Sequence, residues 1–244
     1  ELYYDRGEKY DPEGIGEKLF FEDLENDRYI EVWNIVFSQY DCRPGEVERS
    51  EYKELPQKNI DTGMGLERLV CLIQDGEINF DTDLFLPIIH ATEQYAKHSY
   101  SEKEYKMAYR VIADHIRTVT FAIADGAMFS NEGRGYVLRR VLRRAVRYGI
   151  KLGIDGAFMY KLVKVVADNM IAYYPYVQEK VALIEKLVKQ EEESFHKTLA
   201  NGEALLQDAL AEHADTKILP GEVMFKLYDT YGYPKELTTE IAEE

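Results

Sequence analysis

One run of twelve residues, from Asn59 to Val70, constrains the fold of this chain more than any other segment. It begins as an extended segment, passes through Gly63 and Gly65, and continues into an apolar helix that opens with an acid–base pair. The two glycines leave room for a flat ligand against the backbone and tolerate positive φ at a turn. A helix that starts here points free N–H groups back at the glycines, which favours an anion such as phosphate. The run therefore predicts a strand–turn–helix unit with a ligand at the turn.

Two side chains of this run could contact such a ligand. Asp61, just before the glycines, could bind an ammonium group, and Arg68, one turn into the helix, could hold a phosphate or stack on a base. The same residues are also compatible with an ordinary strand–turn–helix that carries a surface Glu67–Arg68 pair, because a lone G-x-G is weak evidence. Features elsewhere in the chain have to decide between these two interpretations.

The length and composition indicate a globular chain. With 244 residues, of which 45% are hydrophobic and 31% charged, it has material for one large or two ordinary domains. No apolar run approaches the ~20 residues of a membrane span, and the first residues show no signal-peptide pattern. Because the chain begins without Met on what reads as a strand, we expect a fragment of a longer protein.

The cysteines and histidines predict no metal centre. Cys42 and Cys71 form no C-x-x-C and have no histidine nearby at zinc spacing, so we expect two inert thiols and no zinc site. Two unpaired cysteines fit a reducing cytoplasm. The five histidines are scattered, and we interpret each as structural or surface-exposed.

The charge is unevenly distributed. The whole chain has a formal net charge of −15, but residues 1–84 hold nine Lys/Arg against 22 Asp/Glu, whereas the remainder holds 21 against 23. Within that remainder, Arg134 to Lys151 contains seven basic residues and no acidic one. Since local patches decide whether a polyanion binds, the acidic total does not exclude a nucleic-acid ligand.

The pattern of side chains divides the chain into two parts. Residues 1–84 look mixed α/β, with a buried strand over 29–40, a polar loop or hairpin over 41–54 and a helix over 66–74. From Leu84 onward the pattern is helical. Helices are expected over 84–97, 101–124, 136–152, 157–173 and 177–213, followed by a closing segment over 222–228, a turn over 229–234 and a short amphipathic end. Ser101 and Glu104 have the spacing of a capping box at the start of the second helix.

The helix over 136–152 carries a row of arginines. The row consists of Arg139, Arg140, Arg143, Arg144 and Arg147. Their spacing puts them on one side of the helix, and Leu138, Leu142 and Val146 lie on the opposite, core-facing side. Arginine favours bidentate contacts with phosphate, so the row indicates a nucleic-acid surface. The alternative is a solvated face whose arginines pair with acids of neighbouring helices.

Four blocks of the sequence together resemble the alanyl-tRNA synthetases, a family of class II aminoacyl-tRNA synthetases. The blocks are EVWNIVF at 31–37, DTGMGLER at 61–68, SNEGRGYVLRR at 130–140 and LYDTYGYP at 227–234. The second is similar to the third signature motif of class II enzymes, and the first resembles a strand on the floor of their active site. The other two resemble parts of the tRNA-recognition domain. The match runs along almost the whole length of the chain, with the blocks in order and at sensible spacing.

This resemblance implies an α+β fold in two domains. Residues 1–84 would be the C-terminal part of the antiparallel class II catalytic sheet, and residues 85–244 a mostly helical tRNA-recognition domain. The family uses ATP and Mg²⁺ to activate alanine to alanyl-adenylate and then attaches it to tRNA, as an enzyme of protein biosynthesis.

Roles for individual residues follow from the same resemblance. Asp61 and Asn34 would bind the alanine ammonium group, and Val36 and Gly63 would wall a small side-chain pocket. The ATP site would consist of Gly65, Arg68 and Glu31, with Arg68 as the catalytic cation and Glu31 as a Mg²⁺ ligand.

The helical domain would recognise the tRNA acceptor stem. Asn131 and Asp229 would flank its G·U wobble pair, whose unpaired guanine amino group is a donor in the minor groove. The arginine row would bind the adjacent phosphates.

The resemblance is incomplete in the catalytic part. The family's first motif and most of its second, which carries an arginine for the α-phosphate, have no counterpart in the sequence. We therefore expect no useful adenylate formation by this chain alone. A different possibility is a non-catalytic helical module that binds RNA or protein. An unrelated nucleotide-binding enzyme is disfavoured because neither G-x-x-x-x-G-K-[ST] nor a strand-linked G-x-G-x-x-G occurs.

Overall fold

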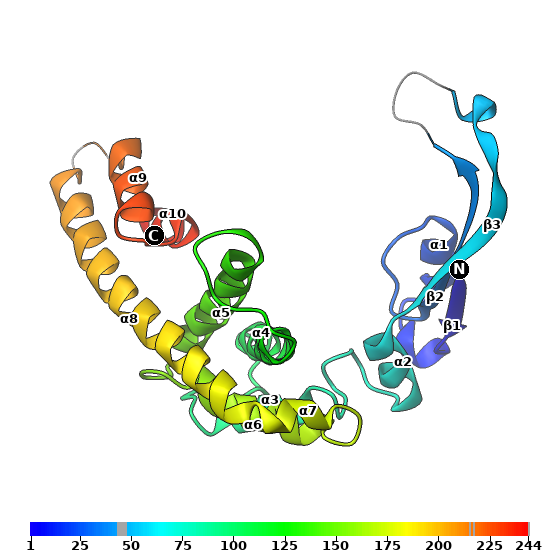
Figure 1. Ribbon diagram of the computed structural model, residues 1–244, viewed down its shortest axis with the longest axis horizontal. Coiled ribbons are helices and arrows are strands. Elements are labelled where there is room, and N and C mark those ends of the chain that lie inside the picture. Colours follow the sequence, from blue (N-terminus) through cyan, green and yellow to red (C-terminus); the bar gives the residue numbers. More distant parts are fainter. Residues whose placement is uncertain (43–47, 215, 217, 244) are drawn as a thin grey trace. The chain divides into compact units, whose positions relative to one another are not determined.

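A computed structural model of the chain describes residues 1–42, 48–214, 216 and 218–243. The chain divides into two compact units, Glu1–Leu84 and Phe85–Glu244 (Figure 1). The first contains a three-stranded antiparallel sheet and the second is helical, so the expected α+β class is confirmed.

The sheet of the first unit has the order β1-β2-β3, and both neighbouring pairs are antiparallel. Its strands are β1 (Leu2–Asp5), β2 (Tyr29–Asp41) and β3 (Lys53–Met64). The unit also contains 3₁₀ turns at Glu8–Tyr10 and Arg49–Glu51 and the helices α1 (Gly16–Phe21) and α2 (Leu66–Ile73). The strand expected over 29–40 and the helix expected over 66–74 are confirmed, but the expectation that this strand is buried is wrong, because all residues of β2 are half-buried or exposed. The loop or hairpin expected over 41–54 lies partly outside the described residues.

The glycine turn differs from the sequence expectation. Gly63 lies inside β3, where it pairs with Asn34 of β2, and its φ is not positive. The ladder between the two strands continues one residue further, to Trp33 and Met64, and this pairing keeps Gly63 extended. The chain turns only at Gly65, which precedes α2 with φ −75° and donates its N–H to the carbonyl of Val32 at 3.3 Å.

The second unit is a bundle of helices (Figure 1). They are α3 (Leu86–Glu93), α4 (Lys106–Ala124), α5 (Gly133–Lys151), α6 (Met159–Met170), α7 (Pro175–Glu179), α8 (Val181–Glu212), α9 (Gly221–Asp229) and α10 (Lys235–Glu243). Helix α4 packs against α5 and α6, while α8 packs along α5 and α6 and then meets α9. The apolar side of α5 is buried as expected, with Leu142 and Val146 at 0% exposure.

Several predicted helix boundaries are wrong: α3, expected over 84–97, ends at Glu93, and the expected capping box of Ser101 and Glu104 lies before α4 rather than at its start. Helix α4 begins at Lys106 rather than Ser101, because the backbone N–H of Ser99 binds the Glu102 carboxylate at 2.7 Å and the hydroxyl of Ser101 binds that of Ser99. The helix expected over 177–213 is broken at Lys180, between α7 and α8. At this break the ammonium group of Lys180 donates to the carbonyl of Ala124 at the end of α4, which connects the junction of α7 and α8 to another helix.

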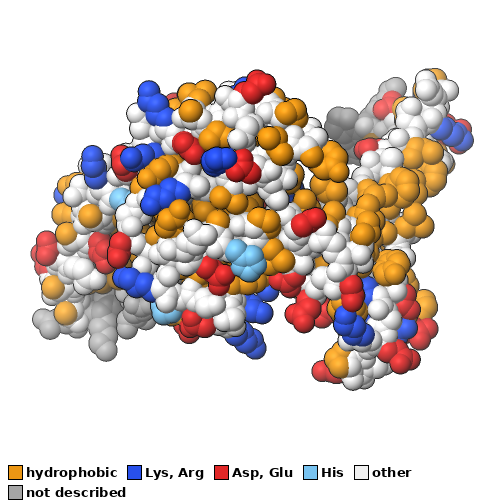
Figure 2. Space-filling view, turned by 90° about the horizontal axis from the view of Figure 1, so that it is seen from below, with side chains coloured by type: hydrophobic (Ala, Val, Ile, Leu, Met, Phe, Trp, Pro, Cys, Tyr) orange, Lys and Arg blue, Asp and Glu red, His pale blue; other side chains and the backbone are white. Residues whose placement is uncertain are grey.

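The two units differ in how much apolar surface they bury. Among the buried apolar side chains of the described residues, Cys71 is the one that lies in the first unit. Val36, Phe37 and Ile60 of the β2–β3 hairpin are 51%, 62% and 63% exposed, and Figure 2 shows apolar side chains gathered along this sheet. No helix in the described part of the chain is both long enough and apolar enough to cross a membrane.

Candidate aminoacyl and RNA sites

The four residues expected to bind alanine form two facing pairs in the β2–β3 hairpin. Asn34 lies opposite Gly63, and Val36 lies opposite Asp61. Opposed residues of an antiparallel pair share a face of the sheet, with Cβ atoms about 5 Å apart, so all four lie on one face. Asp61 is exposed, and a Cβ built on Gly63 would meet no atom within 4 Å. The patch is therefore open, and packing within the chain does not explain the glycine.

Glu31 reaches the same face because the register of β1 and β2 shifts. Tyr3 pairs with Glu31, whereas Leu2 pairs with Trp33, so one residue of β2 is left without a partner. Leu2 and Tyr3 are successive residues of β1, so they face opposite sides of the sheet. Their partners in β2, Trp33 and Glu31, therefore face opposite sides as well. Simple alternation would have put Glu31 and Asn34 on opposite faces. The shift brings them to one face, and Trp33 binds the hydroxyl of Thr62 on the other.

Arg68 is held beside Glu31. Its Nη1 donates to the Glu31 carbonyl at 3.0 Å and lies 3.4 Å from Glu31 Oε2. The Arg68 side chain is 50% exposed, so the guanidinium keeps a face toward solvent. Gly65 lies directly beneath it, since a Cβ on Gly65 would be 3.5 Å from Cγ and Cδ of Arg68. Within the described residues no group of three or more His, Cys, Asp or Glu side chains is placed to hold a metal ion.

The arginine row of the second unit has two kinds of members. Arg140 and Arg144 are exposed. Arg139 and Arg143 instead bind one carboxylate of α8, that of Glu191, with Arg139 Nε 3.1 Å from Oε2 and Arg143 Nη2 2.8 Å from Oε1. Arg139 and Arg143 therefore share one carboxylate, which offsets half of their combined positive charge, and phosphate binding by these two arginines stays a prediction. Arg147 is half-buried, and its charge acts on the phenol of Tyr233.

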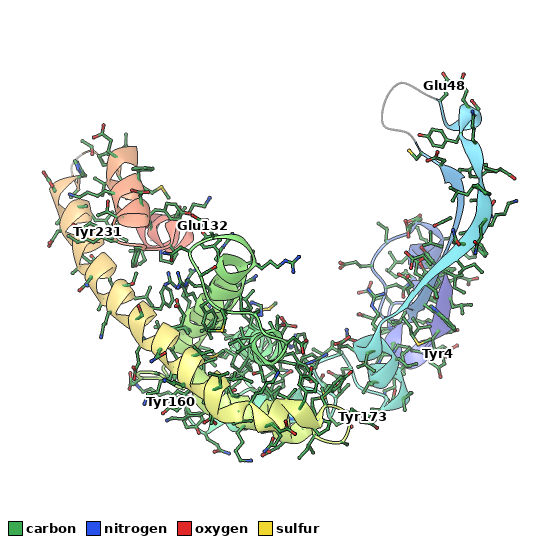
Figure 3. The ribbon with its side chains drawn as sticks, in the orientation of Figure 1. Tyr4, Glu48, Glu132, Tyr160, Tyr173 and Tyr231 are labelled. Carbon is green, nitrogen blue, oxygen red and sulfur yellow. The ribbon has the colours of Figure 1, made fainter. Side chains whose placement is uncertain are left out.

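Asn131 lies in the loop before α5 and contacts that helix. It is exposed, and its Oδ1 accepts a hydrogen bond from Arg139 Nη1. The loop can lie this close because Gly135 has no side chain: a Cβ there would overlap the carbonyl oxygen of Met128 and the backbone nitrogen of Ser130. The next residue, Glu132, directly precedes α5, and its label in Figure 3 marks where this loop meets the helix.

Asp229 lies at the C-terminal end of α9 and is exposed. Its neighbour Tyr228 places its hydroxyl 3.4 Å from that of Tyr136, in the first turn of α5. The turn after α9 is anchored by Tyr233, which is 1% exposed and packs on α8 where Gly202 leaves space. Contacts within the second unit therefore bring Asn131 and Asp229 to neighbouring ends of α5 and α9.

Comparison with known proteins identifies the family of the chain. A family model described as tRNA synthetases class II (A) matches residues 1–244. The chain belongs to this family. Similar curated proteins include the alanine–tRNA ligases of Lactococcus lactis subsp. cremoris (strain MG1363), 56% identical over 248 residues, and of Streptococcus pneumoniae (strain Hungary19A-6), 57% identical over 246 residues. Both alignments cover 100% of this chain but 28% of the relative, so this class II synthetase chain spans about a quarter of the length of these relatives.

Three supporting residues of this synthetase chain were missed by the sequence analysis. Glu191, Gly135 and Gly202 hold the surroundings of Asn131 and Asp229 in place. Gly202 stands alone in a helical pattern, which signals close packing in general but names no partner. Gly135 lies just before the helix expected over 136–152, so the sequence gives no sign that it packs inside a helix. Glu191 lies in an acidic run of a long helix, and its sequence context gives no sign that it is buried.

Proposed function

We propose that this chain is part of an ATP-dependent alanine–tRNA ligase, in which residues 1–84 contribute to the alanine and ATP sites and residues 85–244 bind the tRNA acceptor stem. The observation that carries the proposal is the open patch on the β2–β3 hairpin, where the pairs Asn34–Gly63 and Val36–Asp61 share one face. Family membership supports the same reaction.

The patch suits a small amino acid. The Asp61 carboxylate supplies a negative charge for the ammonium group, and the Asn34 amide supplies a hydrogen bond beside it. Val36 and Gly63 bound the space for the side chain. Such a pocket excludes large side chains by steric overlap, but one methyl group gives only ~1–3 kcal/mol of discrimination against glycine.

Arg68 and Glu31 suit the nucleotide. The guanidinium, fixed through the Glu31 backbone, would meet a phosphate or stack on adenine. Mg²⁺ typically binds to one or two protein carboxylates together with substrate phosphates, so Glu31 would serve as a single protein ligand to the ATP-bound ion. Reaction in such a site depends chiefly on positioning and on stabilising charge.

The second unit suits the minor groove of an acceptor stem with a G·U pair. The Asp229 carboxylate accepts hydrogen bonds only and would take the guanine amino group. Since Arg139 donates to Asn131 Oδ1, the amide nitrogen of Asn131 is free to donate to an acceptor in the same groove. Arg140 and Arg144 would bind phosphates, and Arg147 would lie at the edge of this surface.

The test is a binding titration of the full chain with two acceptor-stem hairpins that differ only in G·U against G·C. We expect tighter binding of the G·U hairpin, by about 5- to 100-fold for one or two base contacts. Both affinities should fall as salt rises, because phosphate contacts release counterions. Equal binding of the two hairpins would leave a generic RNA-binding surface, and no binding at low salt would favour a protein-interaction module.

A further inference from the structure

Glu191 is a buried charge with a specific set of partners. Its residue is 9% exposed, in the middle of α8, and both its oxygens face α5. Oε1 accepts from Arg143 at Nε (2.9 Å) and Nη2 (2.8 Å), while Oε2 lies 3.1 Å from Arg139 Nε. A buried carboxylate is costly unless it is paired, and here two guanidinium groups one helical turn apart pair with it.

Arg139 connects this carboxylate to the proposed RNA site. Its Nε faces Glu191, and its Nη1 donates to Asn131 Oδ1. Because a guanidinium has donors and no acceptor, the Asn131 atom that faces Arg139 has to be the oxygen, and the amide nitrogen points away. The contact of Arg139 Nε with Glu191 is an ion pair that lacks hydrogen-bond geometry, so Arg139 is held by a hydrogen bond at Asn131 and by charge attraction at Glu191.

We propose that Glu191 and Arg139 are positioning residues, which fix the orientation of the Asn131 amide so that it discriminates between base pairs. The inference rests on the proposed function, because it assigns the purpose of this chain of contacts to G·U recognition. Arg143 alone could hold α5 to α8 through Oε1, so the contact of Oε2 with Arg139 is not needed for that packing.

The test substitutes Glu191→Gln in the full chain. Glutamine keeps the shape but has one acceptor oxygen, so it can pair with Arg143 or with Arg139 but not with both. We expect the ratio of G·U to G·C hairpin affinity to fall about fivefold, the cost of one poorly made hydrogen bond. The affinity for the G·C hairpin should stay the same or rise, because two arginines lose their neutralising partner. A purely structural defect would lower the affinity for both hairpins together.

Two comparisons isolate the route through Asn131. Glu193→Gln makes the same change of charge on α8 at an exposed side chain, and it should leave the ratio unchanged. In a chain that already carries Asn131→Ala, Glu191→Gln should lower the ratio no further. A further fall in that background, or an unchanged ratio after Glu191→Gln alone, would overturn the proposal.

A measurement without RNA separates this inference from the proposed function. In the full chain labelled with ¹⁵N-asparagine, the side-chain amide signal of Asn131 is identified by its loss in Asn131→Ala. We expect this signal to be dispersed in the unchanged chain and to move to the position of a free amide after Glu191→Gln, but not after Glu193→Gln. If the unchanged chain showed no preference for G·U, the proposed function would fail, and this signal alone would decide whether Glu191 and Arg139 fix the amide.

Discussion

At the scale of single residues, the proposed RNA site depends on an absent side chain. Gly135, in the first turn of α5, lies against the backbone of Met128 and Ser130, the loop that leads into Asn131. Glycine inside a helix costs ~1 kcal/mol relative to alanine, so the position trades helix stability for the close approach of this loop. The resemblance assigns a role to Asn131, but the local sequence does not show which residue lets its loop lie on the helix.

Gly135→Ala tests this close approach. A methyl group at 135 would overlap backbone atoms of Met128 and Ser130, and backbone cannot rotate away as a side chain can. We expect the loop to move, so that the free energy of unfolding falls by about 1–3 kcal/mol and the preference for the G·U hairpin is lost. Chemical denaturation and the hairpin titration measure the two effects.

Gly221→Ala is the matched control for that substitution. Gly221 begins α9, has no positive φ, and a Cβ there would meet nothing within 4 Å. Gly221→Ala should leave both the free energy of unfolding and the preference for the G·U hairpin nearly unchanged. If Gly135→Ala behaved in the same way, the loop would not be held by this contact.

At the scale of helices and strands, periodic patterns predict elements well and tertiary contacts poorly. Strand β2 and helix α5 were predicted nearly to their ends, because aromatic and β-branched residues fill one and an apolar face runs along the other. The register shift opposite Tyr3, the break at Lys180 and the pairing of Glu191 with α5 were not predicted. Each depends on a partner that is distant in the sequence, so no local pattern contains it.

Helix α6 shows such a contact at its N-terminus. The Glu192 carboxylate of α8 accepts the backbone N–H of Phe158 at 2.9 Å and that of Met159 at 3.0 Å. These groups have no partner within α6, and the carboxylate caps them from another helix. Glu192 is 0% exposed, and burial raises its pKa from 4.5 to about 7.

The raised pKa of Glu192 predicts how stability depends on pH. Between pH 4.5 and about 7 the folded chain keeps a proton on Glu192 that the unfolded chain has lost, so the free energy of unfolding falls as pH rises. The full shift corresponds to about 3 kcal/mol. Glu192→Gln should remove this decline, whatever it does to the absolute stability, and denaturation at a series of pH values measures it.

The comparison between variants is needed because other groups titrate in this range. Burial lowers the pKa of His196, also on α8, and this makes the chain more stable as pH rises, which is the opposite trend. Glu193→Gln, which keeps the buried carboxyl group, should retain the decline seen in the unchanged chain. Parallel curves for the unchanged chain and for Glu192→Gln would show that Glu192 does not titrate in this window.

At the scale of the whole molecule, the two units differ in how many apolar side chains they bury. The second buries apolar side chains from most of its helices, including Ile112, Leu142 and Phe195 at 0% exposure. In the first, Cys71 is the one buried apolar side chain among the described residues, and the hairpin exposes apolar side chains of both faces, such as Val36 and Phe37. A small sheet needs a covered hydrophobic face to be stable in water. We therefore expect the first unit, whose sheet carries the proposed alanine site, to be the less stable of the two.

Amide hydrogen exchange on the full chain tests this difference. Amides of α4, α5, α6 and α8 should exchange slowly, with protection near the global free energy of unfolding, whereas those of β2 and β3 should exchange many-fold faster through local opening.

Because alanine and ATP would have to order this sheet on binding, the chain by itself should show little ATP–pyrophosphate exchange at millimolar substrates. Slow amide hydrogen exchange in β2 and β3, together with ATP–pyrophosphate exchange near the rate of a full-length alanine–tRNA ligase, would contradict both expectations. Slow amide hydrogen exchange in β2 and β3 without activity would show that low stability of the sheet is not the cause of the inactivity.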